Sequence, residues 1–220
     1  MYKNCLWKIP ENLYFEEATL MDPAANGYNA VVQQGNLKSG EIVVVFGVGA
    51  LGLMSIAQAS IAGASKIIAV GMKADRKRRE KIARKYGADE FFASDEEENI
   101  VEKVKEAARE DGVALVVDAA GVPALTSAAI QIVRSEGSIV RIGMSNKTYE
   151  DSLDGFSLKN IRFSGHMGYN QESWRNTLAL AKAEKLNLKP IITCILPLEE
   201  YQQGFDMTKN QEASKVVLVP

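Results

Sequence analysis

Histidine, cysteine and long apolar runs are scarce in this 220-residue sequence. Its one histidine is His166, and its two cysteines, Cys5 and Cys194, lie far apart without CxxC spacing, so neither a disulfide framework nor a zinc knuckle is indicated. No apolar run approaches the roughly 20 residues that span a bilayer, and the N-terminus has no basic segment followed by an apolar one. We therefore expect a cytoplasmic protein without membrane contact. The net charge of −2 argues against nucleic acid as the main partner, because no net field would attract a polyanion.

The sequence does contain a glycine-rich turn between an apolar strand and an apolar helix. Residues 42–46 read IVVVF, and residues 53–62 form an alanine-rich apolar segment. In the GxGxxG pattern between them, the first glycine permits a sharp turn, the second lets the backbone approach a pyrophosphate, and the third lets the helix pack closely. The helix N-terminus would bind the phosphates through free N–H groups and the helix dipole. We interpret the turn as a nucleotide site, with a purely structural turn as the alternative. Its residues are Gly47, Val48, Gly49, Ala50, Leu51 and Gly52.

Strands and helices alternate along most of the chain, which predicts βαβ units and a doubly wound parallel sheet, the Rossmann fold. After the glycine turn, strands are expected at residues 66–70, 90–92, 115–119, 138–142 and 160–165. Helices are expected at residues 24–34, 53–62, 76–86, from 94 onward, 124–133 and 172–185. Asp22 is read as the N-cap of the first helix, with Pro23 at its first position. Two extended runs, 191–196 and 215–219, flank a helix near 199–208 and do not fit the alternation.

Several short motifs, in this order and spacing, resemble the medium-chain, zinc-type alcohol dehydrogenases, in particular the threonine and polyol dehydrogenase-like branch. The resemblance covers nearly the whole chain and implies a nicotinamide cofactor, alcohol–carbonyl oxidoreduction and a homodimer or homotetramer. The motifs are KIPEN (8–12), Asp22-Pro23, VFGVGALG (45–52), YGAD (86–89), DAAG (118–121), Lys159-Asn160-Ile161 leading to Ser164-Gly165, PIIT (190–193) and KVV (215–217).

One departure from this family concerns the metal. Members of the family carry a first half that holds the catalytic zinc ligands, and this sequence has no cysteine and histidine with usable spacing for zinc. We therefore interpret the chain as the C-terminal, cofactor-binding half of such a dehydrogenase, inactive alone, with zinc expected only in the N-terminal half and no catalytic residue in this chain. Asp22 is a weak candidate for a place near that zinc. The expected division is 1–21, a remnant of the catalytic-domain edge; 22–165, the dinucleotide-binding domain; and 166–220, a helix and strands returning towards the catalytic domain.

The remaining candidate cofactor contacts follow the ends of the strands, where ligands bind in open α/β sheets. Sites specific for NAD usually place an acid at the end of the second strand, and none stands there, so we favour NADP, whose 2′-phosphate Lys73 and Arg76 or Lys77 could pair with. Asp75 reaching a ribose is the open alternative. Gly121 and Gly143 could instead be turn glycines, and Met144 could be a packing residue. These contacts are Gly71, Met72, Lys73, Arg76, Ala120, Gly121, Gly143 and Met144.

Three other readings share the glycine turn. A short-chain reductase needs a YxxxK pair, and no tyrosine here has a lysine four residues later. A methyltransferase usually has an acid just before the glycines, where this chain has Val45 and Phe46. A stand-alone, non-catalytic nucleotide-binding or redox-sensing module stays open as the alternative to a dehydrogenase.

Overall fold

A single parallel sheet of six strands organises the chain. The structure is a computed structural model that describes residues 6–109 and 112–220, so Cys5 lies outside the described residues. The strand order is β3-β2-β1-β4-β5-β6, and every neighbouring pair is parallel. This order confirms the predicted doubly wound fold, with the reversal between β1 and β4. The strands are β1 (Ile42–Phe46), β2 (Lys66–Gly71), β3 (Glu90–Ala93), β4 (Val113–Asp118), β5 (Val133–Arg141) and β6 (Arg162–Gly165).

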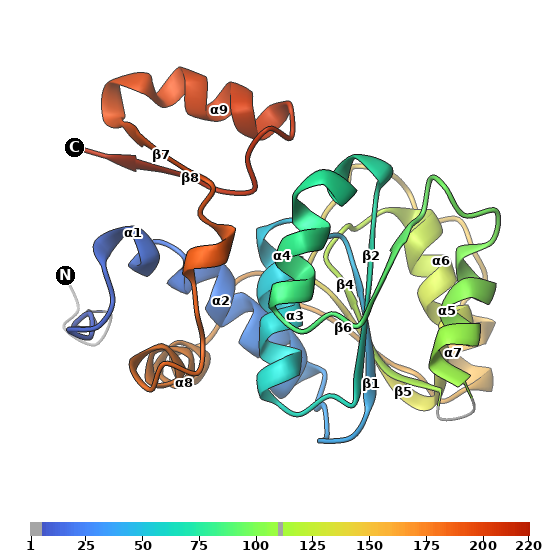
Figure 1. Cartoon of the computed structure of the whole chain (residues 1–220). Coiled ribbons are helices and arrows are strands. Elements are labelled where there is room, and N and C mark those ends of the chain that lie inside the picture. Colours follow the sequence, from blue (N-terminus) through green and yellow to red (C-terminus); the bar gives the residue numbers. More distant parts are fainter. Residues whose placement is uncertain (1–5, 110–111) are drawn as a thin grey trace.

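Helices cover both faces of this sheet (Figure 1). On one face lie α2 (Met21–Tyr28), the π-helix η2 (Asn29–Gln34), α3 (Ala50–Ile61), the 3₁₀ helix η3 (Lys73–Lys77) and α4 (Arg79–Lys85). On the other lie α5 (Ile100–Ala108), α6 (Pro123–Ile132) and α7 (Asp154–Leu158). The sheet is therefore buried on both sides, which explains why the β1 sequence is a continuous apolar run instead of an alternating one.

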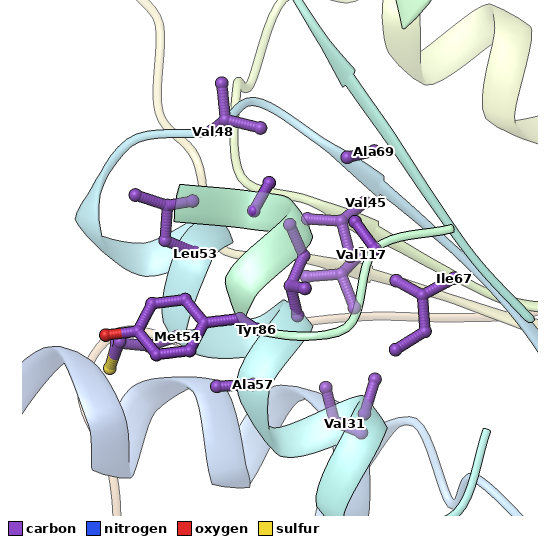
Figure 2. Packing of buried hydrophobic residues seen from close by; sticks show 14 of the residues in the cluster. Val31, Val45, Val48, Leu53, Met54, Ala57, Ile67, Ala69, Tyr86 and Val117 are labelled. Atoms are coloured by element: carbon purple, nitrogen blue, oxygen red, sulfur yellow. The ribbon is translucent and has the colours of Figure 1, made fainter. Parts of the chain in front are cut away.

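Two hydrophobic cores result, one on each face of the sheet. In β1, Val43 and Val45 belong to the core beneath α2, α3 and α4, whereas Ile42, Val44 and Phe46 belong to the core beneath α5 and α6. This alternation is the two-residue period of a strand. Figure 2 shows the first core, where side chains of α3 pack against those of β1, β2 and β4. The glycine turn thus follows a strand that is packed on both faces.

The first helix begins earlier than its sequence predicts. The structure starts α2 at Met21 with Leu20 as N-cap, so the reading of Asp22 as N-cap is wrong. Asp22 lies in the first turn, where its charge still complements the helix dipole, and its backbone oxygen accepts a hydrogen bond from Asn26 Nδ2 at 3.0 Å. The expected single helix over 24–34 is α2 followed directly by η2.

A second boundary also differs from the prediction. Residues 94–97 were expected to start a helix, but α5 begins at Ile100, with Asn99 as its N-cap accepting from the backbone N–H groups of Val101 and Glu102. Asparagine is among the best N-cap residues. The acidic residues before it are instead engaged with the segment after β2: Asp95 accepts from the backbone N–H of Lys73 at 2.7 Å.

The last part of the chain lies partly on the main core and partly beyond it. Helix α8 (Gln171–Lys182) packs on α2, and Leu186, Leu188 and Ile191 join the core of the sheet. Strands β7 (Cys194–Pro197) and β8 (Val216–Val219) form a separate two-stranded parallel sheet with α9 (Tyr201–Lys209) between them in the chain (Figure 1). The remaining short elements are α1 (Phe15–Ala18), η5 (Lys189–Ile191) and η6 (Leu198–Glu200).

The expected division of the chain into three parts, with boundaries after residues 21 and 165, stays a prediction.

Within the described ranges, no helix is both long and apolar enough to cross a membrane.

Candidate nucleotide-binding site

The glycine turn lies where β1, β2 and β4 end side by side. Gly47 has φ +86°, a left-handed conformation that favours glycine. Its N–H donates to the carbonyl oxygen of Val70 at 2.8 Å, and the N–H of Ala119 donates to Phe46 at 2.8 Å. A Cβ on Gly47 would lie 3.0 Å from the backbone nitrogen of Ala120. The first glycine of the motif is therefore required by the backbone itself.

The other two glycines of the motif have opposite surroundings. A Cβ on Gly52 would overlap the carbonyl oxygen of Gly47, so the first turn of α3 packs directly on the loop only because residue 52 has no side chain. A Cβ on Gly49 would meet nothing within 4 Å. The protein therefore gives no packing reason for glycine at 49, and the space above it is open to a ligand.

The N-terminus of α3 faces this open space. Gly49 is its N-cap, and no side chain caps the helix. The first intrahelical bond runs from Leu53 N to Gly49 O, at 2.9 Å, so the N–H groups before it have no partner within the helix. Gly49, Ala50 and Leu51 are partly exposed, whereas Val48 and Gly52 are buried. The site thus presents backbone donors and a dipole to an anion, without a basic side chain.

The loop after β4 is held by a buried carboxylate that sequence reasoning missed. Asp118 is fully buried; its Oδ1 accepts from the N–H groups of Ala120 (3.2 Å) and Gly121 (2.7 Å), and its Oδ2 accepts from Thr126 Oγ1 at 3.0 Å. An aspartate that ends an apolar strand and stands three residues before a glycine is the sequence signal of such a turn.

The loops after β4 and β5 touch through their glycines. A Cβ on Gly121, whose φ is +69°, would lie 2.5 Å from Gly143 C, and a Cβ on Gly143 would lie 2.5 Å from Gly121 N. Arg141 Nη2 and Ser145 Oγ both donate to the carbonyl oxygen of Gly121, at 2.8 and 2.7 Å. Both glycines therefore have a structural reason for being present. Met144 is 77% exposed and is not a packing residue in this structure.

The segment after β2 brings together the four candidates predicted there. Gly71 lies against the glycine turn, since a Cβ on it would be 2.9 Å from Val48 Cγ2. Lys73 and Arg76 both form ion pairs with Glu96, at 3.5 and 2.6 Å. The hydrogen bond between Arg76 and Glu96 raises the pKa of the guanidinium and lowers the pKa of the carboxyl. The two basic side chains are therefore already paired with a carboxylate.

The surroundings of Asp22 do not form a metal site. Asp22 is exposed, and across residues 6–109 and 112–220 no three His, Cys, Asp or Glu side chains are grouped so that they could hold a metal ion. Burial raises the pKa of the nearby Tyr169, and the charge of Asp22 adds to this. His166 follows β6, and burial lowers the pKa of its imidazole.

Comparison with known proteins decides the family. Residues 50–183 match the family model described as zinc-binding dehydrogenase. The chain belongs to the zinc-binding dehydrogenase family. Among similar proteins of this family are a zinc-type alcohol dehydrogenase-like protein, YdjL, of Escherichia coli K12 (33% identical, 99% of this chain and 61% of that protein) and a D-xylulose reductase A of Aspergillus oryzae (29% identical, 96% and 59%).

Solved structures agree with this assignment. The alcohol dehydrogenase TADH of Thermus sp. ATN1 superposes with a TM-score of 0.88 at 32% identity, over 97% of this chain and 60% of that one. The chain thus spans about 60% of the length of these three relatives. The resemblance predicted from its motifs is confirmed.

Proposed function

We propose that this chain is the portion of a zinc-type alcohol or polyol dehydrogenase that binds the nicotinamide dinucleotide. The observation that carries the proposal is the contrast within the glycine motif. Gly47 and Gly52 are closed in by backbone, whereas Gly49 faces open space at the uncapped N-terminus of α3. This is the geometry that a pyrophosphate needs, and it lies at the reversal of strand order between β1 and β4.

Different groups of the chain would bind different parts of the dinucleotide. Backbone donors of Gly49, Ala50 and Leu51 bind the pyrophosphate, with Val48 beneath it. The adenosine half extends over the end of β2, and the nicotinamide half extends over the loops after β4 and β5, which Asp118 and the glycine contact hold in place. Bound there, the nicotinamide supplies the hydride acceptor for oxidation of a CH–OH group to a carbonyl in the whole protein. The residues in contact are Gly47, Val48, Gly49, Ala50, Leu51, Gly52, Gly71, Met72, Ala120, Gly121, Gly143 and Met144.

Zinc does not fit the described residues, because they provide no group of three suitable side chains. We assign no catalytic residue to this chain and derive no step through a metal. The chain alone is predicted to bind the nucleotide without transferring a hydride. A stand-alone module is not favoured, because 99% of the chain, and not the glycine turn alone, aligns with a dehydrogenase-like protein.

Two finer expectations stay predictions. The preference for NADP rests on the lack of an acid at the end of β2 in the sequence. The pairing of Lys73 and Arg76 with Glu96 reduces the positive charge available to a 2′-phosphate. Assembly into a homo-oligomer rests on the family resemblance.

Calorimetric titration with NAD and NADP tests the proposal. Wild-type protein should bind at least one of them, and Gly49→Ala should weaken binding about tenfold or more while the protein stays folded, because its Cβ has room but occupies the pyrophosphate side. Gly40→Ala is the matched control: its Cβ also meets nothing within 4 Å, but Gly40 precedes the opposite end of β1. Its φ of +89° costs stability without affecting binding. A folded wild-type protein that binds neither nucleotide would overturn the proposal.

A further inference from the structure

An acid is present at the end of β2, although the sequence position expected to carry one is occupied by Gly71. Four residues later, η3 folds back and directs Asp75 to this point: a Cβ on Gly71 would lie 2.9 Å from Asp75 Oδ2. The space that a side chain at position 71 would enter is therefore filled by a carboxylate from the following helix. The end of β2 therefore has a carboxylate beside it, although the residue at that sequence position is a glycine.

This carboxylate is fixed and borders the glycine turn. Its Oδ2 accepts from the backbone N–H of Met72 at 2.9 Å, and its Oδ1 accepts from Arg79 Nη1 at 3.0 Å. The same imagined Cβ of Gly71 would also lie 2.9 Å from Val48 Cγ2. Asp75 is only 7% exposed, so it is held in one position instead of moving freely in solvent. Each carboxylate oxygen can accept more than one hydrogen bond, so a ribose hydroxyl can still be bound.

The charges around Asp75 do not favour a second phosphate. Arg79 is engaged by Asp75 itself at 3.0 Å, and Lys73 and Arg76 pair with Glu96. Arg76 also pairs with Glu80 at 3.3 Å. A 2′-phosphate that paired with Lys73 or Arg76 would compete with Glu96 and would face the charge of Asp75, whereas a neutral ribose hydroxyl would find a ready acceptor.

We propose that Asp75 is the specificity-determining residue of the nucleotide site: its carboxylate accepts a hydrogen bond from the 2′-hydroxyl of the adenosine ribose and selects NAD against NADP. This inference rests on the proposed function. It adopts the alternative that the sequence left open, in which Asp75 reaches a ribose, in place of the expected preference for NADP.

The experiment is calorimetric titration of the whole chain with NAD, NADP, 5′-AMP, 2′-deoxy-5′-AMP and 2′,5′-ADP. Wild type should bind NAD at least tenfold more tightly than NADP, and 5′-AMP about tenfold more tightly than its deoxy analogue. Asp75→Asn should reduce the preference for NAD about tenfold. The control Asp95→Asn removes an equal charge from a neighbouring exposed carboxylate and should leave the preference unchanged.

The outcomes separate this inference from the proposed function. Binding of NAD and NADP with equal affinity, tighter binding of NADP, or an unchanged preference in folded Asp75→Asn overturns the role of Asp75 and leaves the proposed function standing. Binding of no nucleotide overturns both. Where Asp75→Asn does not fold, the wild-type comparison of 5′-AMP with 2′-deoxy-5′-AMP decides, since equal affinities overturn the role.

Discussion

Replacing Gly52 by alanine tests whether the glycine turn and α3 are built as one unit. The new Cβ would overlap the carbonyl oxygen of Gly47 and lie 2.9 Å from the carbon of that carbonyl, closer than the 3.0 Å that real Cβ contacts keep. Both obstacles are backbone atoms, so no flexible side chain can move aside. Either the first turn of α3 or the loop itself has to shift.

The expected cost follows from these contacts. Overpacking costs about 1 to 3 kcal/mol, and a backbone obstacle places this case near the upper end. Alanine is favoured over glycine in a helix by about 1 kcal/mol, which offsets part of the cost. We expect a net loss of about 2 kcal/mol in the free energy of unfolding, a large fraction of the roughly 5 to 15 kcal/mol that holds a domain folded.

Urea unfolding followed by far-UV circular dichroism measures this loss. Gly49→Ala is the matched control, because its Cβ meets nothing within 4 Å and its φ of −73° suits alanine. It should leave the free energy of unfolding unchanged or raise it by up to about 1 kcal/mol. A loss below about 0.5 kcal/mol in Gly52→Ala would refute the close approach of helix and loop.

Three further predictions concern side chains outside the glycine turn. Lys159→Met should lower the free energy of unfolding by about 2 kcal/mol, because Lys159 Nζ donates to three carbonyl oxygens, at the end of α6 and the start of β5, at 2.9 to 3.0 Å. Chemical unfolding tests this, with exposed Lys147→Met as control. Thr126→Val should cost about 1 to 3 kcal/mol by removing a donor from buried Asp118, and an unchanged thermal midpoint would contradict this. His166, the one histidine, should titrate in an NMR experiment below its ordinary pKa of 6.5, because burial disfavours the charged imidazole. The contribution of His166 to stability should then be fully present above pH 6.5 and be lost as the pH falls towards the pKa of the folded state. A titration midpoint of His166 at or above pH 6.5 would contradict the burial.

The architecture was predictable from the sequence because it depends on local patterns. The six runs expected as strands between residues 42 and 165 all contribute strands to the main sheet, and their alternation with helices indicated that these strands are parallel. Boundaries were less accurate where local signals compete. Asp22-Pro23 has the form of a helix start, yet α2 begins at Met21, and β5 begins at Val133 directly after α6, where the sequence RSEG resembles a loop.

Of the candidate site, only the part that a local sequence motif specifies was predictable. GxGxxG identified the turn because Gly47 and Gly52 have local backbone tasks and Gly49 leaves space for a ligand. The partners of Lys73 and Arg76, the position of Asp75 and the support of Asp118 by Thr126 depend on contacts between elements, or on how a short helix folds back. No periodicity in the sequence records such contacts, so the acid at the end of β2 could not be placed from its residue number.

The central position of β1 has a consequence for how the chain reaches its fold. Val44 pairs with Ile68, 24 positions later, and with Val116, 72 positions later. The first pairing closes a short loop and the second a long one, so we expect β1 and β2 to associate first. Until β4 pairs with β1, the valine-rich β1 is an unpaired sheet edge, to which other chains can add. Refolding yield should therefore depend on concentration, and the interval before β4 docks is when the chain is most prone to aggregate.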